Sequence, residues 1–224
     1  MAIDIELANG DTLQGGESTR SSPLHIQNMP LKGNHYRASA FTGTIAAATA
    51  ADSEVFQFRF VGGTKSYALV TKIELCGAGI VAVSTAIGPI GFYVTPARAW
   101  TAAGTGGTRL ALTTNNANLE TAIGVSQVDD IGISTTAALS AGTKTLDTSS
   151  IGQVITGVLT GATTVQQLAP LFPQADLFNS LNQGGMPLVL ATQEGFVIRT
   201  THTGPTALTY AAGFAVSWVE VTSF

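Results

Sequence analysis

Residues 53–60 read SEVFQFRF, and this short stretch indicates the class of the fold. Phe56, Phe58 and Phe60 alternate with Gln57 and Arg59, which is the period of two that side chains follow along a β-strand. One face of such a strand is apolar and the other is polar. We therefore expect a half-buried strand that places its three phenylalanines on a hydrophobic core.

Residues 66–75, SYALVTKIEL, follow after the short VGGT segment and also alternate. The odd-numbered positions from Tyr67 to Leu75 form one face, and Lys72 and Glu74 lie on the other. The two strands with a turn at 61–64 predict an antiparallel hairpin. Residues 187–200, PLVLATQEGFVIRT, predict a second hairpin with its corner at Glu194 and Gly195.

Further strand patterns extend to the end of the chain. Residues 90–100, IGFYVTPARAW, are strand-like, with Pro96 at an edge, a bulge or a strand end. Residues 209–221, TYAAGFAVSWVEV, predict that the carboxyl end is tied into a sheet. Weaker strand patterns and one short helical candidate complete the set: strands at 128–134, 153–159 and 163–168, and helical turns at 116–123. Many short strands with little helix periodicity predict an all-β fold, an antiparallel β-sandwich that is jelly-roll-like.

The amino-terminal segment differs from the rest of the chain. Residues 1–36 hold much of the charge, a Gly-Gly pair, two prolines and no aromatic residue before Tyr36. A segment of this composition lacks the apolar content for its own core. We expect an extended N-terminal arm over residues 1–36, ordered against a neighbour, and a sandwich body over residues 37–224.

The composition limits the partners of the protein. Its 224 residues are 45% hydrophobic and only 11% charged, with a net charge of −4, whereas about 25% charged residues is typical of soluble domains. A surface so poor in ions suits contact with other protein and predicts a homo-oligomer. The ten basic residues are scattered, which argues against nucleic acid. With neither a signal-peptide pattern nor a long apolar run, we expect a chain made in a cytoplasm that has no membrane partner.

Glycine-rich stretches raise the question of nucleotide binding. Residues 75–82, LCGAGIVA, resemble the start of a dinucleotide fingerprint, but a β-branched segment with Gly88-Pro89 follows in place of a helix. We interpret Gly77 and Gly79 as a bend between strands. VGGTKS and SAGTKT lack the glycine that a phosphate-binding loop places directly before its lysine. We therefore predict no cofactor.

Candidate catalytic and metal-binding residues are few. His25, His35 and His202 do not have metal-ligand spacing, and Cys76 is the single cysteine. Asp129 and Asp130 are adjacent, so on a strand they would point to opposite faces. No nucleophile motif is present. These observations predict no catalytic, cofactor-binding or metal site and a protein that is not an enzyme.

Two tryptophans are candidates for a binding surface. Trp218 lies in an alternating apolar face and is expected in the core. Trp100 precedes a glycine-rich loop, so both exposure and burial remain open for it. Exposed on the surface, it would be the first aromatic to consider for a sugar-binding site.

Several stretches, in order, carry a resemblance to a known group of proteins: SEVFQFRF, GTGGT at 104–108, AALSAGTKTLD at 137–147, PLVLATQEGFVIRT and the closing SWVEV. Together they resemble structural proteins of the virions of tailed bacteriophages, from about His35 to the end of the chain. The resemblance implies a non-enzymatic particle component. Some proteins of this kind decorate or cement the capsid shell, often as trimers, and others belong to the tail or its fibres.

The resemblance does not separate these two groups, and our first hypothesis is a capsid decoration or cement protein that bridges capsomers on the capsid surface. Its partners would be further copies of itself, as a homotrimer, and the major capsid protein, and it would be made in the host cytoplasm. The alternative is a tail-associated adhesin or fibre domain that binds a host glycan. A cell-wall hydrolase is a third possibility that the sequence leaves open.

Overall fold

The structure is a computed structural model. It describes residues 5–6, 12–13, 33–83, 89–112, 117–119, 124–155, 174–204, 206 and 208–223. The chain divides into two units, 1–32 and 33–224. In the first unit, β1 (Ile5–Glu6) pairs with β2 (Thr12–Leu13). The second unit is the body, and it includes residues 33–36, which the sequence assigned to the arm.

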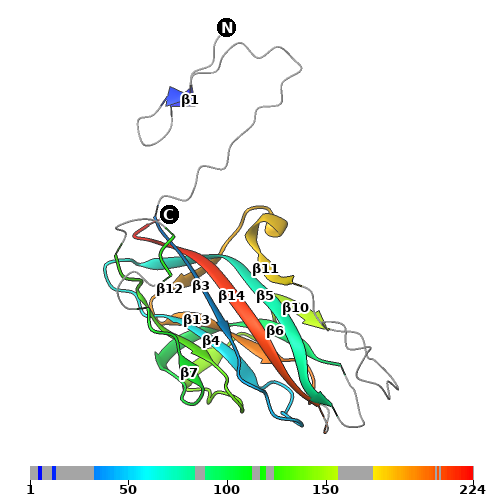
Figure 1. Cartoon of the computed structure of the whole chain (residues 1–224). Coiled ribbons are helices and arrows are strands. Elements are labelled where there is room, and N and C mark those ends of the chain that lie inside the picture. Colours follow the sequence, from blue (N-terminus) through cyan, green and yellow to red (C-terminus); the bar gives the residue numbers. More distant parts are fainter. Residues whose placement is uncertain are drawn as a thin grey trace, which may run out of the picture. The chain divides into compact units, whose positions relative to one another are not determined.

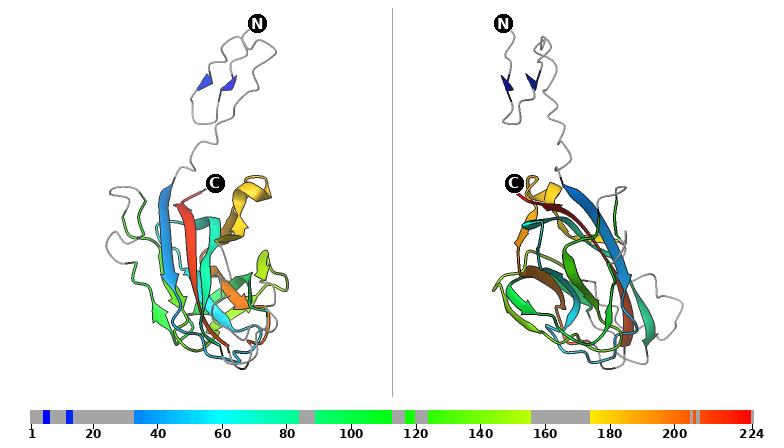
Figure 2. Two further views of the ribbon diagram at one scale, coloured as in Figure 1. Left: turned by 45° about the vertical axis from the view of Figure 1, so that its right-hand side comes forward. Right: turned by 90° about the vertical axis from the view of Figure 1, so that its left-hand side faces the viewer.

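The body consists of two antiparallel sheets that pack face to face, as the right-hand view of Figure 2 shows. Its elements are β3 (Asn34–Phe41), β4 (Glu54–Phe60), β5 (Tyr67–Val83), β6 (Gly91–Ala102), β7 (Thr108–Arg109), β8 (Val128–Ile133), β9 (Thr143–Leu146), β10 (Gly152–Ile155), β11 (Ala175–Asn179), the 3-10 helix η2 (Ser180–Gln183), β12 (Leu188–Ala191), β13 (Glu194–Thr200) and β14 (Leu208–Val221). Figure 1 labels most of these elements.

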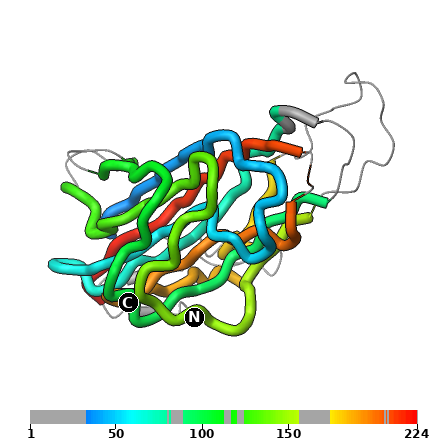
Figure 3. Tube along the Cα trace, turned by 90° about the horizontal axis from the view of Figure 1, so that it is seen from below, coloured from blue at the N-terminus to red at the C-terminus, as the bar shows by residue number. Residues whose placement is uncertain are grey.

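One sheet has seven strands in the order β10-β6-β13-β4-β8-β7, and β9 also pairs with β6. The other has five strands in the order β11-β5-β14-β3, and β12 also pairs with β5. Figure 3 shows β3, β14 and β5 running side by side. The strand pairs are nested: β3 with β14, β4 with β13, β5 with β12, and β6 with β10. This nesting is that of a jelly roll, so the predicted sandwich is confirmed.

Both predicted hairpins are wrong. β4 lies in the seven-stranded sheet and β5 in the five-stranded sheet, so residues 61–66 cross from one layer to the other. The same holds for β12 and β13, on either side of the expected corner at Glu194. A strand with one apolar face can bury that face from either layer. The alternating pattern therefore locates the strands but does not distinguish a hairpin from a crossing between sheets.

The long strand β5 also differs from its prediction. Its pairing with β14 shifts register near Thr71, because Val70 faces Trp218 and Lys72 faces Ser217. The bulge moves the side chains before it to the other face. The inward side chains are Ala68, Val70, Ile73 and Leu75, whereas Leu69 belongs to a separate cluster on the outside.

Gly77 and Gly79 lie inside β5, so the predicted bend between two strands is wrong. Leu75 pairs with Phe214 and Gly77 with Gly213, which leaves Cys76 as an extra residue in the ladder. Gly77 has a φ of 146°, a conformation that other residues rarely adopt. The glycine therefore permits a bulge within one continuous strand.

Other expectations are partly resolved. β8 matches the predicted strand at 128–134, and β10 matches the first residues of the predicted strand at 153–159, of which 156–159 lie outside the described residues. The predicted strand at 163–168 lies outside the described residues. Of the predicted helical turns at 116–123, residues 117–119 are described, and Asn118 forms a β-bridge with Tyr36. Within the described residues, the structure contains no helix of a length and apolarity that would cross a membrane.

Aromatic side chains fill the space between the sheets. Phe58 of β4 stacks on Phe196 with ring centroids 5.0 Å apart, and it meets Trp218 of β14 edge-on at 5.1 Å. Phe214 is 5.8 Å from Phe56 and 5.3 Å from Phe92. These six rings are at most 1% exposed, which confirms that Trp218 and the β4 phenylalanines are core residues.

Replacing Phe58 with alanine should lower the free energy of unfolding by about 3–5 kcal/mol, since it leaves a cavity between the two sheets. Phe41→Ala is the matched control, because its ring is 73% exposed on the outside of the five-stranded sheet. The control should change stability by about 0.5 kcal/mol or less. Denaturant unfolding followed by tryptophan fluorescence measures both variants, and equal losses would contradict the assignment of the core.

Candidate functional site

The outer face of the seven-stranded sheet is covered where the sequence predicts it to be open. Gln57 is fully buried, although it lies on the face of β4 opposite the core. Its amide donates to the Ser140 carbonyl oxygen over 2.8 Å, and the Leu139 N–H donates to the Glu54 carbonyl oxygen over 2.8 Å. The prediction that β4 is half-buried is therefore wrong, because residues 139–140 and the Lys144 side chain contact its outer face.

Trp100 belongs to this covered region. It is fully buried in a small cluster with Ala97, Val197 and Leu146, and its Nε1–H donates to the Ala102 carbonyl oxygen over 3.0 Å. The hypothesis that Trp100 is exposed and is the first aromatic residue of a sugar-binding site is therefore wrong. Its indole is part of the packing that holds the covering segment on the sheet.

A buried ion pair sits under the same segment. The Lys144 side chain is 1% exposed, and its Nζ lies 2.9 Å from Glu54 Oε2 and 4.5 Å from the centroid of the Trp100 ring. Gln57 Nε2 donates to the same carboxylate oxygen over 2.5 Å. Burial lowers the pKa of Lys144, and the hydrogen bond to Glu54 opposes that shift. The ion pair connects β9 to β4. Since both side chains are buried, loss of either one would leave the other charge buried without a partner.

The adjacent acids Asp129 and Asp130 do not form a shared site. Asp129 pairs with Arg59 on the surface, whereas Asp130 is buried and lies 3.3 Å from Arg109 Nη1. Burial raises the pKa of Asp130, and the charge of Arg109 opposes that rise. Each carboxylate thus neutralises its own arginine.

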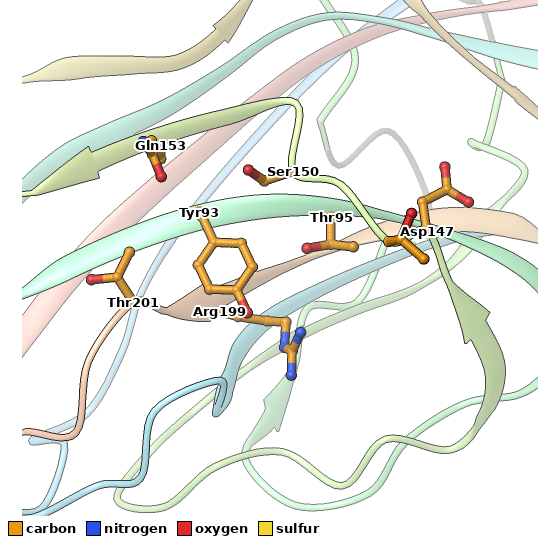
Figure 4. Close-up of a pocket in the computed structure, with 8 residues that line it drawn as sticks. Tyr93, Thr95, Asp147, Ser150, Gln153, Arg199 and Thr201 are labelled. Atoms are coloured by element: carbon orange, nitrogen blue, oxygen red, sulfur yellow. The ribbon is translucent and has the colours of Figure 1, made fainter.

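A polar hollow lies next to this covered region, on the same outer face (Figure 4). Its volume is about 290 Å³. The lining comes from β6, from β13 and the residue after it, from β10 and from the connection between β9 and β10: Tyr93, Thr95, Asp147, Thr148, Ser150, Gln153, Arg199 and Thr201. We call it the Tyr93 hollow.

Strand pairing places the central residues of the Tyr93 hollow in one row. Gln153 of β10 and Arg199 of β13 are the register partners of Tyr93 on its two sides. Because paired residues point to the same face, their side chains meet above the sheet. Figure 4 shows the Tyr93 ring in the middle, with Arg199 beside it and Thr95 further along the same strand.

Asp52 fixes the orientation of two of these side chains. The Tyr93 hydroxyl donates to Asp52 Oδ1 over 2.6 Å, and Arg199 Nε donates to the Asp52 carbonyl oxygen over 2.9 Å. The Arg199 guanidinium lies 5.5 Å from the Tyr93 ring centroid. Burial and the bond to Asp52 raise the pKa of Tyr93 to about 12, so its phenol remains a donor at neutral pH.

The sequence patterns do not identify the Tyr93 hollow. Tyr93 and Arg199 appear in them only as strand residues, and Gln153 only as the start of a weak strand. The available signal is Pro96, which has no N–H to offer a neighbouring strand. A proline inside a strand pattern marks a place where the pairing is interrupted, and the hollow lies there.

The described residues contain no group of three or more His, Cys, Asp or Glu side chains that could hold a metal ion. His202 Nδ1 is hydrogen-bonded to the Thr201 hydroxyl at 2.7 Å, and His25 lies outside the described residues. Cys76 is partly exposed, and burial raises the pKa of its thiol.

Comparisons with known proteins give no further guidance, because no family model, curated protein or solved structure matches this chain.

Replacing Lys144 with methionine should destabilise the fold by about 3–5 kcal/mol, because it leaves the Glu54 carboxylate buried without its partner. The double variant Glu54→Gln, Lys144→Met should recover most of this loss, since no unpaired charge remains. Lys65→Met, in the connection between β4 and β5, is the control. Denaturant unfolding of the four proteins tests this, and a double variant as unstable as the single one would contradict it.

Proposed function

We propose that this protein is a non-enzymatic structural component of a tailed-bacteriophage particle that decorates the capsid shell and bridges its capsomers. The resemblance of residues 53–60, 104–108, 137–147, 187–200 and 217–221 to virion proteins supports this proposal. So does a surface poor in ions, because apolar and small polar groups lose little hydration free energy when another protein covers them.

The observation that carries the proposal is an exposed apolar surface around η2. Leu181 is 71% exposed and Met186 is 70% exposed. Beside them lies a mainly apolar hollow of about 430 Å³, lined by Ile151, Phe178, Gln183, Met186, Pro187 and Leu188. We call this the η2 surface, and we assign the capsid shell as its partner.

Local structure holds the η2 surface in place. The Asn179 side chain accepts from the Leu181 N–H over 3.0 Å and caps the 3-10 helix, and Gly184 ends it in a left-handed conformation. The flanking strands β11 and β12 are both paired with β5. Leu181 and Met186 thus project from a braced turn, which lowers the entropy lost when they are covered.

Oligomerisation would strengthen such a contact. Each apolar side chain that is buried contributes about 1.5–3 kcal/mol, so one η2 surface alone gives modest binding. In a homotrimer, the second and third contacts form at high effective concentration. The protein then resists opening of the shell without needing a tight single contact.

The alternative is a tail-associated adhesin, and the Tyr93 hollow is the observation that favours it. The two functions differ in where the protein sits and in how many copies a particle holds. The copy number of a decoration protein follows the number of capsomers, whereas a fibre or tail protein is present in few copies.

On purified particles, the copy number should be comparable with that of the major capsid protein, and an electron micrograph should place the protein on the head. Quantitative gel electrophoresis against the capsid band measures the ratio. If the particle holds far fewer copies of this protein than of the capsid protein, and the micrograph places it on the tail, the decoration function is overturned in favour of the adhesin.

The double variant Leu181→Asp, Met186→Asp should bind particles that lack the protein about tenfold more weakly or worse, because it removes two apolar contacts and adds two charges. Asn182→Asp is the control, since it adds a charge on η2 without removing apolar surface. Co-sedimentation with such particles measures occupancy. Unchanged binding of the double variant would exclude the η2 surface as the contact.

A further inference from the structure

We propose that the Tyr93 hollow binds a neutral saccharide. The proposal concerns the chain itself and holds wherever the protein sits on a particle. It rests on the backbone that forms the hollow, on a buried hydroxyl at its floor and on the balance of its charges.

The backbone opens the hollow by a mismatch in length. The Asp147 N–H donates to the Pro96 carbonyl oxygen and the Ile151 N–H to the Val94 carbonyl oxygen, both over 3.0 Å. The two acceptors are two positions apart on β6, whereas the two donors are four positions apart. The residues between the donors therefore bow away from β6. Pro96 cannot donate to them, and the space beside β6 stays open.

Thr95 lies on β6 at this opening and provides the first contact. The residue is 3% exposed, and its Oγ1 has no hydrogen-bond partner in the structure. Leaving a buried hydroxyl without a partner is unfavourable, so such groups are uncommon and call for an explanation such as a bound molecule. Thr95 is one of the residues that line the hollow, and a threonine hydroxyl can both donate and accept a hydrogen bond.

The charges of the hollow exclude a strongly ionic ligand. Arg199 Nη2 lies 3.9 Å from Asp52 Oδ2, and Asp147 Oδ2 lies 3.3 Å from Arg98 Nη2. Each charge therefore already has a partner of opposite sign. A phosphate or a second carboxylate would compete with an existing ion pair, whereas a neutral ligand need not disturb either.

The remaining groups match the hydroxyls of a sugar. Ser150 and Thr148 offer hydroxyls, and Gln153 offers an amide with both a donor and an acceptor. Neighbouring sugar hydroxyls need such mixed partners within a small area. Because Asp52 holds Tyr93 and Arg199 in position, the shape of the hollow is set before a ligand arrives, which reduces the entropy lost on binding.

The test uses the full chain and saturation-transfer NMR. The probes are glucose, galactose, mannose and N-acetylglucosamine, with N-acetylneuraminic acid and glucose 6-phosphate as charged counterparts. At least one neutral sugar should receive saturation and bind with a dissociation constant on the order of 1 mM, as expected for a small open site. The charged sugars should bind more weakly or not at all.

Thr95→Val decides whether the hydroxyl serves the ligand. The change keeps the shape and removes a hydroxyl without a partner, so the unfolding midpoint should stay the same or rise. Sugar binding should fall at least tenfold, and Gln153→Ala should reduce it similarly. Thr101→Val, at an exposed position further along β6, should bind like the parent protein.

Three outcomes would overturn the proposal. The first is the absence of saturation transfer to every neutral sugar. The second is transfer that persists at full strength in both Thr95→Val and Gln153→Ala. The third is binding of the charged sugars alone, which would refute the charge argument. None of these outcomes bears on the capsid location, which the copy number tests separately.

Discussion

The structure depends on aromatic packing between β4 and β14, one strand from the middle of each sheet. Phe58 meets Trp218 edge-on, and Phe56 meets Phe214 at a tilt. Each ring buries a large apolar area, and rings in these geometries attract one another beyond that burial. Because β4 lies between β13 and β8, and β14 between β5 and β3, these contacts set how the two layers face each other.

The packing also decides what the outer faces can hold. With its aromatic positions turned inward, β4 presents Glu54 and Gln57 to the other side, where residues 139–140 and the Lys144 side chain contact them and both are buried. A buried carboxylate requires a partner, and Lys144 supplies it. The covering segment is thus fixed to the sheet by charge and by its contact with Trp100, and just beyond β9 it bows away from β6 to leave the Tyr93 hollow.

The sequence predicts most of the strands and the inward phenylalanines of β4, because alternation is a local property. It does not predict their pairing, since β4 and β5 are neighbours in the chain but lie in opposite sheets. The bulge at Thr71 reverses the face of Tyr67 and Leu69 for a similar reason: the extra residue is defined by the partner strand.

The candidate site is less predictable still. The Tyr93 hollow gathers residues from β6, β10 and β13, and their proximity follows from pairings that are distant in sequence. The burial of Trp100 likewise follows from packing against Val197 and Leu146, two residues far from it in the chain. Pro96 is the one local sign of the interrupted edge, and by itself it tells nothing about the side chains that gather there.

One short segment connects the two surfaces to which we assign functions. Ser150 lines the Tyr93 hollow, and its neighbour Ile151 lines the apolar hollow of the η2 surface. Close by, β10 approaches β11 so tightly that a side chain at Gly152 would collide with the Leu177 carbonyl oxygen. The edge of the seven-stranded sheet is thereby joined to the edge of the five-stranded sheet. Adjacent residues of this one segment thus line two different hollows, one polar and one mainly apolar.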